Sequence, residues 1–448
     1  MDSNDQSTST QGYDPNALPN DPRIDRVLNR YIHALGGYLK NKADRTRVPG
    51  AAVMVRRGNE IVHMNCYGYA NLETDQKIKP STIFDLGSMS KQFTAVAVLS
   101  LVSQEFSLTD PISKFFKNFP RYSDSITVEQ LIHHTSSLPS YLDIYVASRQ
   151  AEEDWYDTAL AKPDEWYPEM LSRKKKELTN KDVLCWIADQ KLLHEKPNTE
   201  FEYSNSGYVV LAELVERVAK MRYSAYLKGI FEAHGMTDTF VFDETSRFAS
   251  DAPEVVNHAK CYNRVTGEGF VPVGYTPLNF IYGDGNIHST IIDLAKWDTD
   301  LHRLDYSAIC TKKESDKAIL NRFRDLLWAP VRLKNRKRVD YGAGWNLLSN
   351  KYEEEVEENG KRVTKSYESR AEYHRGLWLG WRSYIARGAR WVVPEAGADM
   401  DPNTWESLGI VVLSNNNQFN PCRIAQNISQ LYWGKLKKEN IMNRFNCS

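Results

Sequence analysis

The stretch GSMSKQFTA, residues 87–95, stands where a strand or loop ends and a largely apolar helix is expected over residues 88–105. Ser88 and Lys91 are three residues apart, so their side chains share one face of that helix. The Ser88 hydroxyl would lie at the positive N-terminal end, where developing negative charge is favoured. A desolvated lysine, with its pKa below the free value of about 10.4, can act as the base for such a serine. The pattern therefore indicates an activated serine nucleophile.

The Ser-x-x-Lys spacing is weak evidence by itself. A second match, Ser172 to Lys175, lies in a charged stretch that is typical of a solvated helical face. No apolar helix follows that serine, so we interpret it as a chance match. The alternative for Ser88 is an ordinary helix N-cap.

A second motif, Tyr203-Ser204-Asn205, precedes a clearly helical segment over residues 208–218. A tyrosine can pass protons through its phenol, and an asparagine amide can donate to a substrate carbonyl. Residues 69–71 (Tyr-Ala-Asn) fit the same pattern, and a packed loop tyrosine is the alternative. Only its combination with other motifs makes the triplet informative.

The third motif is His374-Arg375-Gly376, just before a strand-like segment around Trp381. It is the only His-x-Gly in the chain, and no Lys-x-Gly occurs. A glycine here lets a strand edge approach a substrate closely, with backbone N–H groups facing it. The alternative is a histidine at a strand edge with no chemical role.

In this order the three motifs resemble those of the class C serine β-lactamases, D,D-peptidases, D-aminopeptidases and related esterases. The resemblance runs from about Pro49 to Trp433. It includes further segments at residues 131–138, 231–239, 283–295 and 341–345. It implies a β-lactamase/transpeptidase-like fold of the α/β (α+β) class, with an antiparallel sheet flanked by helices and an inserted, mostly helical region.

The resemblance also implies roles for individual residues. Ser88 would form the acyl-enzyme, while Lys91 and Tyr203 would share the base and acid work. Asn205 would bind the substrate's amide carbonyl, and the backbone N–H groups of Ser88 and Leu377 would form the oxyanion hole. The loop at residues 283–286 would flank the cleft. No metal and no cofactor are implied.

One departure from the family concerns substrate selectivity. His374 stands where a lysine helps to bind a free carboxylate in carboxypeptidases and β-lactamases. Arg375 could supply the missing charge, but alternation along a strand directs it to the opposite face. The segment Leu377-Trp378-Leu379 is bulkier than usual, which predicts a narrower or more apolar cleft.

The chain is expected to form one composite catalytic domain. Residues 1–21 are predicted to be a disordered tail, since they are polar and lack the apolar core of a signal peptide. Residues 22–87 and 283–448 would form the sheet part. They contain a predicted helix at 24–39, strands at 51–56, 60–69, 381–391 and 409–413, and a helix at 422–433. Residues 88–282 would form the helical part, with an insertion at about 141–199 that could cap the site.

Composition limits the kinds of partner. The formal charge of −1, from 57 basic and 58 acidic residues, gives no reason to expect nucleic acid or an anionic membrane. No apolar run is long enough to span a membrane. The six cysteines lack the clustered spacing of a zinc or redox motif, which predicts separate reduced thiols. With no export signal, a cytoplasmic location is expected.

Two classes of function remain as hypotheses. The first is a serine hydrolase or acyltransferase acting on a small amide, ester, lactone or thioester, with D-aminopeptidase and β-lactamase/D,D-carboxypeptidase activities as alternatives. The second is a non-catalytic sensor or scaffold that keeps the fold. An α/β-hydrolase would need a G-x-S-x-G elbow, which the chain lacks. The oligomeric state stays open.

Overall fold

A computed structural model describes residues 18–37, 39, 45–103, 105–117, 119–143, 178–243, 257–274, 276, 278–310, 314–358, 360–394, 401–434 and 440–447. Most of the predicted tail, most of the predicted insertion and the second Ser-x-x-Lys match lie outside these residues. None of the described helices is long and apolar enough to cross a membrane.

A six-stranded antiparallel sheet has the order β12-β13-β14-β15-β1-β2. The N-terminal strand β1 pairs along its whole length with the C-terminal strand β15, from Ala51 opposite Ser414 to Arg57 opposite Leu408. The two ends of the chain therefore build one sheet, as predicted, and the expected fold class is confirmed. The strands are β1 (Ala51–Arg57), β2 (Glu60–Tyr67), β12 (Asn346–Glu358), β13 (Lys361–Trp378), β14 (Trp381–Val392) and β15 (Glu406–Ser414).

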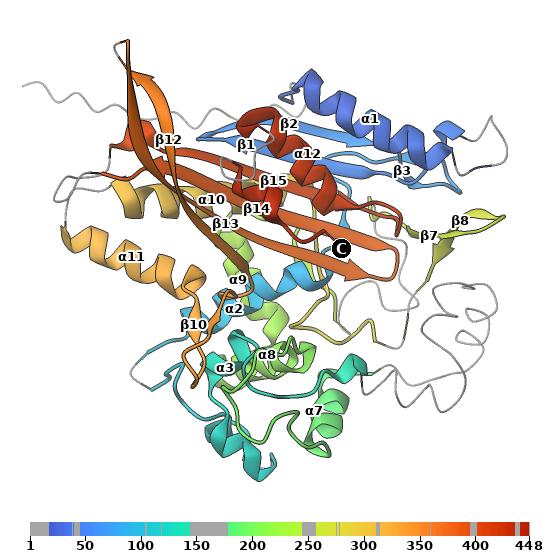
Figure 1. Cartoon of the computed structure of the whole chain (residues 1–448). Helices are drawn as coiled ribbons and strands as arrows, with labels where there is room; N and C mark the ends of the chain where they lie inside the picture. Colours follow the sequence, from blue (N-terminus) through green and yellow to red (C-terminus); the bar gives the residue numbers. More distant parts are fainter. Residues whose placement is uncertain are drawn as a thin grey trace, which may run out of the picture.

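Both faces of this sheet are covered (Figure 1). On β1, Ala52 and Met54 join one hydrophobic core, whereas Ala51, Val53 and Val55 join another. This alternation follows from the two-residue period of a strand. Helices α1 (Pro22–Gly36) and α12 (Pro421–Trp433) cover the second face, and α10 (Ile291–Cys310) packs against the first.

The remaining elements lie mainly on the α10 side of the sheet (Figure 1). The helices are α2 (Lys91–Ser100), α3 (Val128–Ile132), α7 (Asn180–Ala188), α8 (Asn205–Ala219), α9 (Tyr223–Ala233) and α11 (Glu314–Trp328). The 3-10 turns are η2 (Gly87–Ser90), η3 (Ile112–Lys114), η4 (Arg121–Ser125), η5 (Pro402–Thr404) and η6 (Ile441–Arg444). The short strands are β3 (Tyr69–Asn71), β4 (Gln76–Lys77), β5 (Phe84–Asp85), β6 (Phe240–Val241), β7 (Cys261–Val265), β8 (Gly269–Val273), β9 (Ile287–Ser289), β10 (Val331–Arg332) and β11 (Arg338–Val339).

The predicted helix over residues 88–105 differs from the structure at both ends. Residues 87–90 form the 3-10 turn η2, and the α-helix runs only from Lys91 to Ser100. Gly87 has a left-handed φ of +51°, which bends the chain sharply before the helix. Short strands β6 to β8 also occur in the range expected to be helical.

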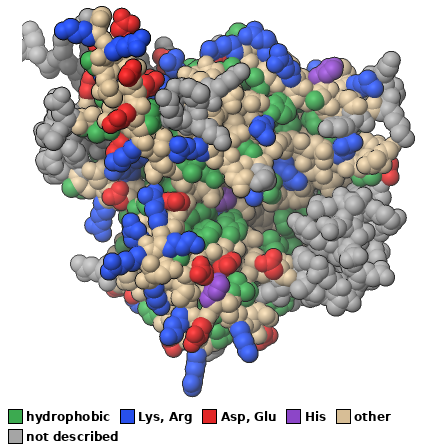
Figure 2. Space-filling view, viewed as in Figure 1, with side chains coloured by type: hydrophobic (Ala, Val, Ile, Leu, Met, Phe, Trp, Pro, Cys, Tyr) green, Lys and Arg blue, Asp and Glu red, His purple; other side chains and the backbone are tan. Residues whose placement is uncertain are grey.

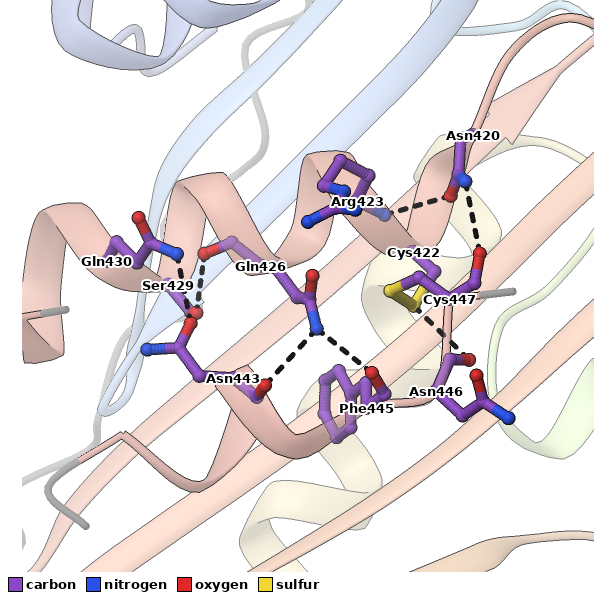
Figure 3. Close-up of a disulfide and its surroundings, with 10 residues drawn as sticks. All are labelled: Asn420, Cys422, Arg423, Gln426, Ser429, Gln430, Asn443, Phe445, Asn446 and Cys447. Atoms are coloured by element: carbon purple, nitrogen blue, oxygen red, sulfur yellow. Dashed lines mark hydrogen bonds between the residues drawn. A yellow bond between two sulfur atoms is a disulfide. The ribbon is translucent and has the colours of Figure 1, made fainter. Parts of the chain in front are cut away.

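The C-terminal segment folds back along α12, as Figure 3 shows. Cys422 and Cys447 form a disulfide with a Cα–Cα distance of 5.4 Å. Beside it, Gln426 Nε2 donates to the Phe445 carbonyl at 3.0 Å, and the Phe445 ring lies 4.5 Å from that of Tyr373 on β13. The expectation of separate reduced thiols is therefore wrong for this pair. The two cysteines are 25 residues apart, a spacing that matches no motif, and only the fold brings them together.

Candidate active site

The turn that carries Ser88 is fastened at several points. It lies between β5 and α2, and its Gly87 N–H donates to Asp85 Oδ1 at 2.7 Å. Strand β9 holds both flanks: Leu86 N–H donates to the Ile287 carbonyl at 2.9 Å, and Ile287 N–H donates to Ser90 Oγ at 3.1 Å. Ser88 itself is half-buried, so its position is set while one side stays accessible.

Lys91, the first residue of α2, is fully buried and points at the serine. Its Nζ lies 3.1 Å from Ser88 Oγ, 2.8 Å from Asn205 Oδ1 and 2.7 Å from the Asp284 carbonyl oxygen. All three neighbours are oxygen atoms that can accept a hydrogen from the lysine nitrogen. These contacts hold the Lys91 side chain in place beside the Ser88 hydroxyl.

Tyr203 lies over the lysine from the other side. Its ring centroid is 5.1 Å from Lys91 Nζ, and the side chain is 40% exposed. The buried ring of His134 packs against it at 4.2 Å, and His134 Nδ1 accepts the Ser204 N–H at 3.1 Å. His134 has a left-handed φ of +56°. His134 therefore fixes the orientation of Tyr203. It lies in a segment of family resemblance but was not among the predicted site residues.

Asn205 begins α8 and joins the same group. Its Oδ1 accepts from Lys91, and its Nδ2 lies 3.4 Å from Ser140 Oγ. The structure thus brings together Ser88, Lys91, Tyr203 and Asn205 from two separate regions of the chain. The catalytic and binding roles expected for them stay predictions.

His374 on β13 lies beside Tyr203, with 6.3 Å between the ring centroids, and is buried. Its Nδ1 lies 2.7 Å from the Arg375 carbonyl oxygen, which can only accept, so Nε2 accepts from the Tyr341 hydroxyl at 3.1 Å. Burial, followed by the nearby charge of Lys91, lowers the pKa of His374 to about 3. The side chain is therefore neutral at pH 7 and offers no fixed charge to a substrate.

Arg375 extends to the opposite face of β13. Its charge acts on the phenols of Tyr373 and Tyr384, whose rings contact the C-terminal Phe445. This agrees with the alternation expected along the strand. The cleft face of β13 thus carries a neutral histidine, and the arginine lies on the α12 side.

Gly376 allows β13 to lie directly against the nucleophile turn. A Cβ at this position would overlap the Leu86 carbonyl oxygen and Ser383 Oγ. A Cβ on Gly87 would lie 3.0 Å from the Leu377 nitrogen, so the two backbone segments are in close contact. The backbone N–H groups expected to form the oxyanion hole, those of Ser88 and Leu377, therefore belong to adjoining segments.

Asp284 also belongs to the site, although it was expected only as part of a flanking loop. Its carbonyl accepts from Lys91, and its buried carboxyl accepts from the Tyr141 hydroxyl at 3.1 Å. Burial raises the pKa of this carboxyl. Within the described ranges, no group of three or more His, Cys, Asp or Glu side chains is arranged to hold a metal.

Aromatic side chains beside the nucleophile are accessible. Phe201 is 39% exposed, in addition to Tyr203, and its ring lies 6.0 Å from that of His134. Figure 2 shows hydrophobic side chains gathered across the middle of the molecule, between the sheet and the helices below it.

Comparison with known proteins agrees with this fold and this set of motifs. The family model described as Beta-lactamase matches residues 30–432, nearly the whole chain. The chain belongs to the β-lactamase family. Membership in this family suggests a serine hydrolase.

One relative is described as a penicillin-binding protein. The chain is 26% identical over 347 residues to Penicillin-binding protein 4* of Bacillus subtilis (strain 168). This alignment covers 75% of this chain and 64% of that protein. It is 28% identical over 207 residues to Protein flp of Staphylococcus aureus (strain N315). This alignment covers 45% of this chain and 36% of that protein. The chain thus spans less than two thirds of the length of these relatives.

Two solved structures share the fold. An octameric penicillin-binding protein homologue from Pyrococcus abyssi aligns with a TM-score of 0.62 and 23% identity, over 94% of this chain and 79% of that chain. A penicillin-binding protein from Bacillus halodurans aligns with a TM-score of 0.57 and 19% identity, over 90% and 99%.

Buried histidines make the fold sensitive to acid. Burial is the main cause that lowers the pKa from 6.5 to about 4 in His63, His133 and His258, and to about 3 in His302 and His374. Between these values and 6.5 the unfolded chain binds more protons than the folded one, so the stabilisation present above pH 6.5 is lost as pH falls. Each histidine can contribute up to about 1.4 kcal/mol per pH unit. We expect the Tm to fall steadily from pH 7 to pH 4.5 in calorimetry, and a flat profile would contradict this.

Proposed function

We propose that this protein is a serine hydrolase or acyltransferase that forms an acyl-enzyme on Ser88. The observation that carries the proposal is the position of Lys91, whose buried Nζ lies 3.1 Å from Ser88 Oγ while two other acceptors hold it. A buried lysine so placed serves as the base for a serine nucleophile. A helix N-cap, the alternative for Ser88, does not require a buried cation or amine beside it.

In the proposed reaction, Ser88 Oγ bonds to the carbonyl carbon of the substrate while its proton passes to Lys91 Nζ. The carbonyl oxygen becomes an oxyanion between the N–H groups of Ser88 and Leu377. The bond to the leaving group then breaks, and the leaving group takes up the proton through Tyr203, whose ring lies over the lysine. Water or another nucleophile then attacks the ester, returning the proton to Ser88. Asn205 would bind a carbonyl of the substrate through its amide.

The proposed substrates are small and neutral at the end that contacts β13. His374 carries no charge at pH 7. Alternation along β13 directs the Arg375 side chain to the other face, and its charge acts on both Tyr384 and His374. Phe201 adds exposed apolar surface beside His134 and Tyr203. Uncharged esters, amides, lactones or thioesters fit these features better than a peptide or β-lactam that ends in a free carboxylate.

A substrate panel tests this function. Purified protein is assayed with p-nitrophenyl esters, D-amino acid amides and a chromogenic cephalosporin. The panel also includes a penicillin and a D-Ala-D-Ala peptide, each beside its neutral ester. We expect the highest kcat/KM with a neutral ester or amide. A clear preference for a penicillin or a D-Ala-D-Ala peptide over its neutral ester would contradict the proposed selectivity. Release of a single equivalent of product without turnover would instead support the sensor hypothesis.

Replacing His374 by lysine is expected to change selectivity. A charge-assisted hydrogen bond to a carboxylate is worth about 1.5–3 kcal/mol. His374→Lys should therefore shift the ratio of kcat/KM values toward carboxylate-bearing substrates by about tenfold or more. Arg375→Gln is the matched control, because alternation along β13 directs that side chain to the opposite face and its loss should leave the ratio unchanged. If Arg375→Gln selectively weakens carboxylate substrates, Arg375 is the carboxylate partner.

The cytoplasmic location stays a prediction, and the disulfide argues against it. It rested in part on the expectation of separate thiols, whereas Cys422 and Cys447 form a disulfide. Such bonds persist mainly in oxidising compartments. Fractionation of the native cells, with alkylation of free thiols before lysis, would show both where the protein resides and whether the pair is oxidised there.

A further inference from the structure

Three buried titratable side chains form a chain behind the nucleophile turn. Asp85 lies on β5, His288 on the neighbouring strand β9, and His258 next to both. Asp85 Oδ1 accepts the Gly87 N–H at 2.7 Å, and Asp85 Oδ2 lies 3.8 Å from His288 Nε2. His288 Nδ1 lies 2.8 Å from His258 Nε2, and His258 Nδ1 lies 2.9 Å from the Ala259 carbonyl oxygen. None of these three side chains takes part in the proposed reaction.

The partners determine where the protons are in this chain. The Ala259 carbonyl can only accept, so His258 Nδ1 carries a hydrogen. If His258 is neutral, its Nε2 accepts from His288 Nδ1, and His288 Nε2 is left as a bare lone pair with no hydrogen-bond partner in the structure. That lone pair faces Asp85 Oδ2. With an ionised carboxylate, two buried acceptors would face each other, and a proton on Oδ2 removes this conflict.

We propose that Asp85 is a positioning residue of the nucleophile turn, kept as a neutral carboxylic acid that accepts from Gly87 through Oδ1 and carries a proton on Oδ2 toward His288. The inference rests on the proposed function of Ser88. It adds a residue that acts through the backbone of the turn without touching the substrate.

A neutral Asp85 is compatible with the oxyanion that is proposed to form at the Ser88 N–H. Gly87 directly precedes Ser88, whose N–H would stabilise the oxyanion. A buried negative charge on Asp85 would lie close to the negative charge that develops there and would raise the barrier. The protonated acid keeps the hydrogen bond that holds Gly87 and avoids this repulsion.

Burial and the neighbouring charges favour the protonated form of Asp85, against the hydrogen bond from the Gly87 N–H, which favours the ionised form. Burial raises its pKa to about 7, and the buried Asp284 across the turn adds to the effect. His288 and His258 are themselves held neutral by burial, and Cys261 on β7 is a further buried group that interacts with Asp85. Because the folded-state pKa lies above that of a free carboxyl, the stabilisation from the bound proton is complete below about pH 4. It is lost as pH rises through about 7.

Asp85→Asn tests the proposal because it imitates the neutral acid. The asparagine Oδ1 can still accept from Gly87, and its Nδ2 can donate to His288 Nε2. We expect kcat at pH 6 within about threefold of the parent, whereas Asp85→Ala should lose about tenfold or more with little change in KM, since it removes the acceptor for Gly87. Above pH 7 the parent should lose kcat as Asp85 ionises, and Asp85→Asn should lack this alkaline decline. Superimposable pH profiles of parent and Asp85→Asn would overturn the proposal.

A readout that needs no turnover separates this proposal from the proposed function. Infrared spectroscopy at pH 6 should show the carbonyl stretch of a buried carboxylic acid in the parent, missing in Asp85→Asn. The stability of the parent relative to Asp85→Asn should also decrease from pH 5 to pH 8. If Ser88→Ala keeps full activity, the proposed function fails, yet these two measurements still decide the protonation of Asp85. An unchanged infrared band or a constant stability difference would show that Asp85 is not the protonated group.

Discussion

Lys91→Met is expected to reduce kcat by about 10²- to 10⁴-fold, the usual contribution of a positioned general base. Methionine fills similar space in the apolar base of α2 but cannot accept a proton from Ser88. The loss should fall mainly on kcat, because Lys91 is fully buried behind the serine and has no free surface to offer a substrate. The measurement is steady-state kinetics on the best ester or amide of the panel, at matched protein stability.

The control for this variant is Lys114→Met. Lys114 follows α2 in the chain and pairs with Asp110 on the surface, where its side chain is 43% exposed. Its replacement should leave kcat unchanged, since exposed ion pairs contribute little. If Lys91→Met retains near-native turnover with an intact fold, the proton-transfer role given to Lys91 is wrong.

Gly376→Ala is expected to reduce kcat by about 10²- to 10³-fold, the cost of losing one oxyanion-hole donor. The added methyl would overlap the Leu86 carbonyl oxygen and Ser383 Oγ, and neither can yield easily because Ser383 Oγ already donates to Leu86 O at 2.6 Å. Strand β13 must therefore move away from the nucleophile turn and take the Leu377 N–H with it. Overpacking of this kind also costs about 1–3 kcal/mol of stability.

Gly229→Ala provides a matched control for this prediction. A Cβ on Gly229 meets no atom within 4 Å, and the residue lies on the exposed face of helix α9. Alanine is the better helix former, so this variant should be more stable by about 0.5–1 kcal/mol with unchanged kcat. Equal loss of kcat in both variants would show that the effect of Gly376→Ala is not specific to the site.

Local periodicity predicted much of the sheet. The strand-like run of β1, the alternation on β14 and the amphipathic spacing of α1 and α12 are properties of single segments. The structure has these elements within a few residues of their predicted bounds. The helix after Ser88 was predicted too long at its start, because apolar spacing does not distinguish a 3-10 turn from the first turn of an α-helix. The strands β7 and β8 were missed, since they are short and carry polar residues such as Asn263.

A pair of contacting site residues could be predicted when both lie in one motif. Pairs from distant motifs could be predicted only from the family resemblance. Ser88 and Lys91 were paired by their spacing, and Asn205 was added by resemblance, although 114 residues separate it from the lysine it contacts. The supporting residues could not be found in this way. His134 orients Tyr203 by stacking, and the carbonyl of Asp284 accepts a hydrogen bond from Lys91. These contacts join residues that are far apart in the sequence, so only the folded chain shows them.

Covalent labelling of Ser88 tests the central claim most directly. A fluorophosphonate probe should add one adduct to the intact mass of the protein, and peptide mapping should place it on Ser88. The Ser88→Ala variant should remain unlabelled, and Ser172→Ala should be labelled like the parent. An adduct on Ser172, or undiminished labelling of Ser88→Ala, would contradict the assignment of Ser88 as the nucleophile.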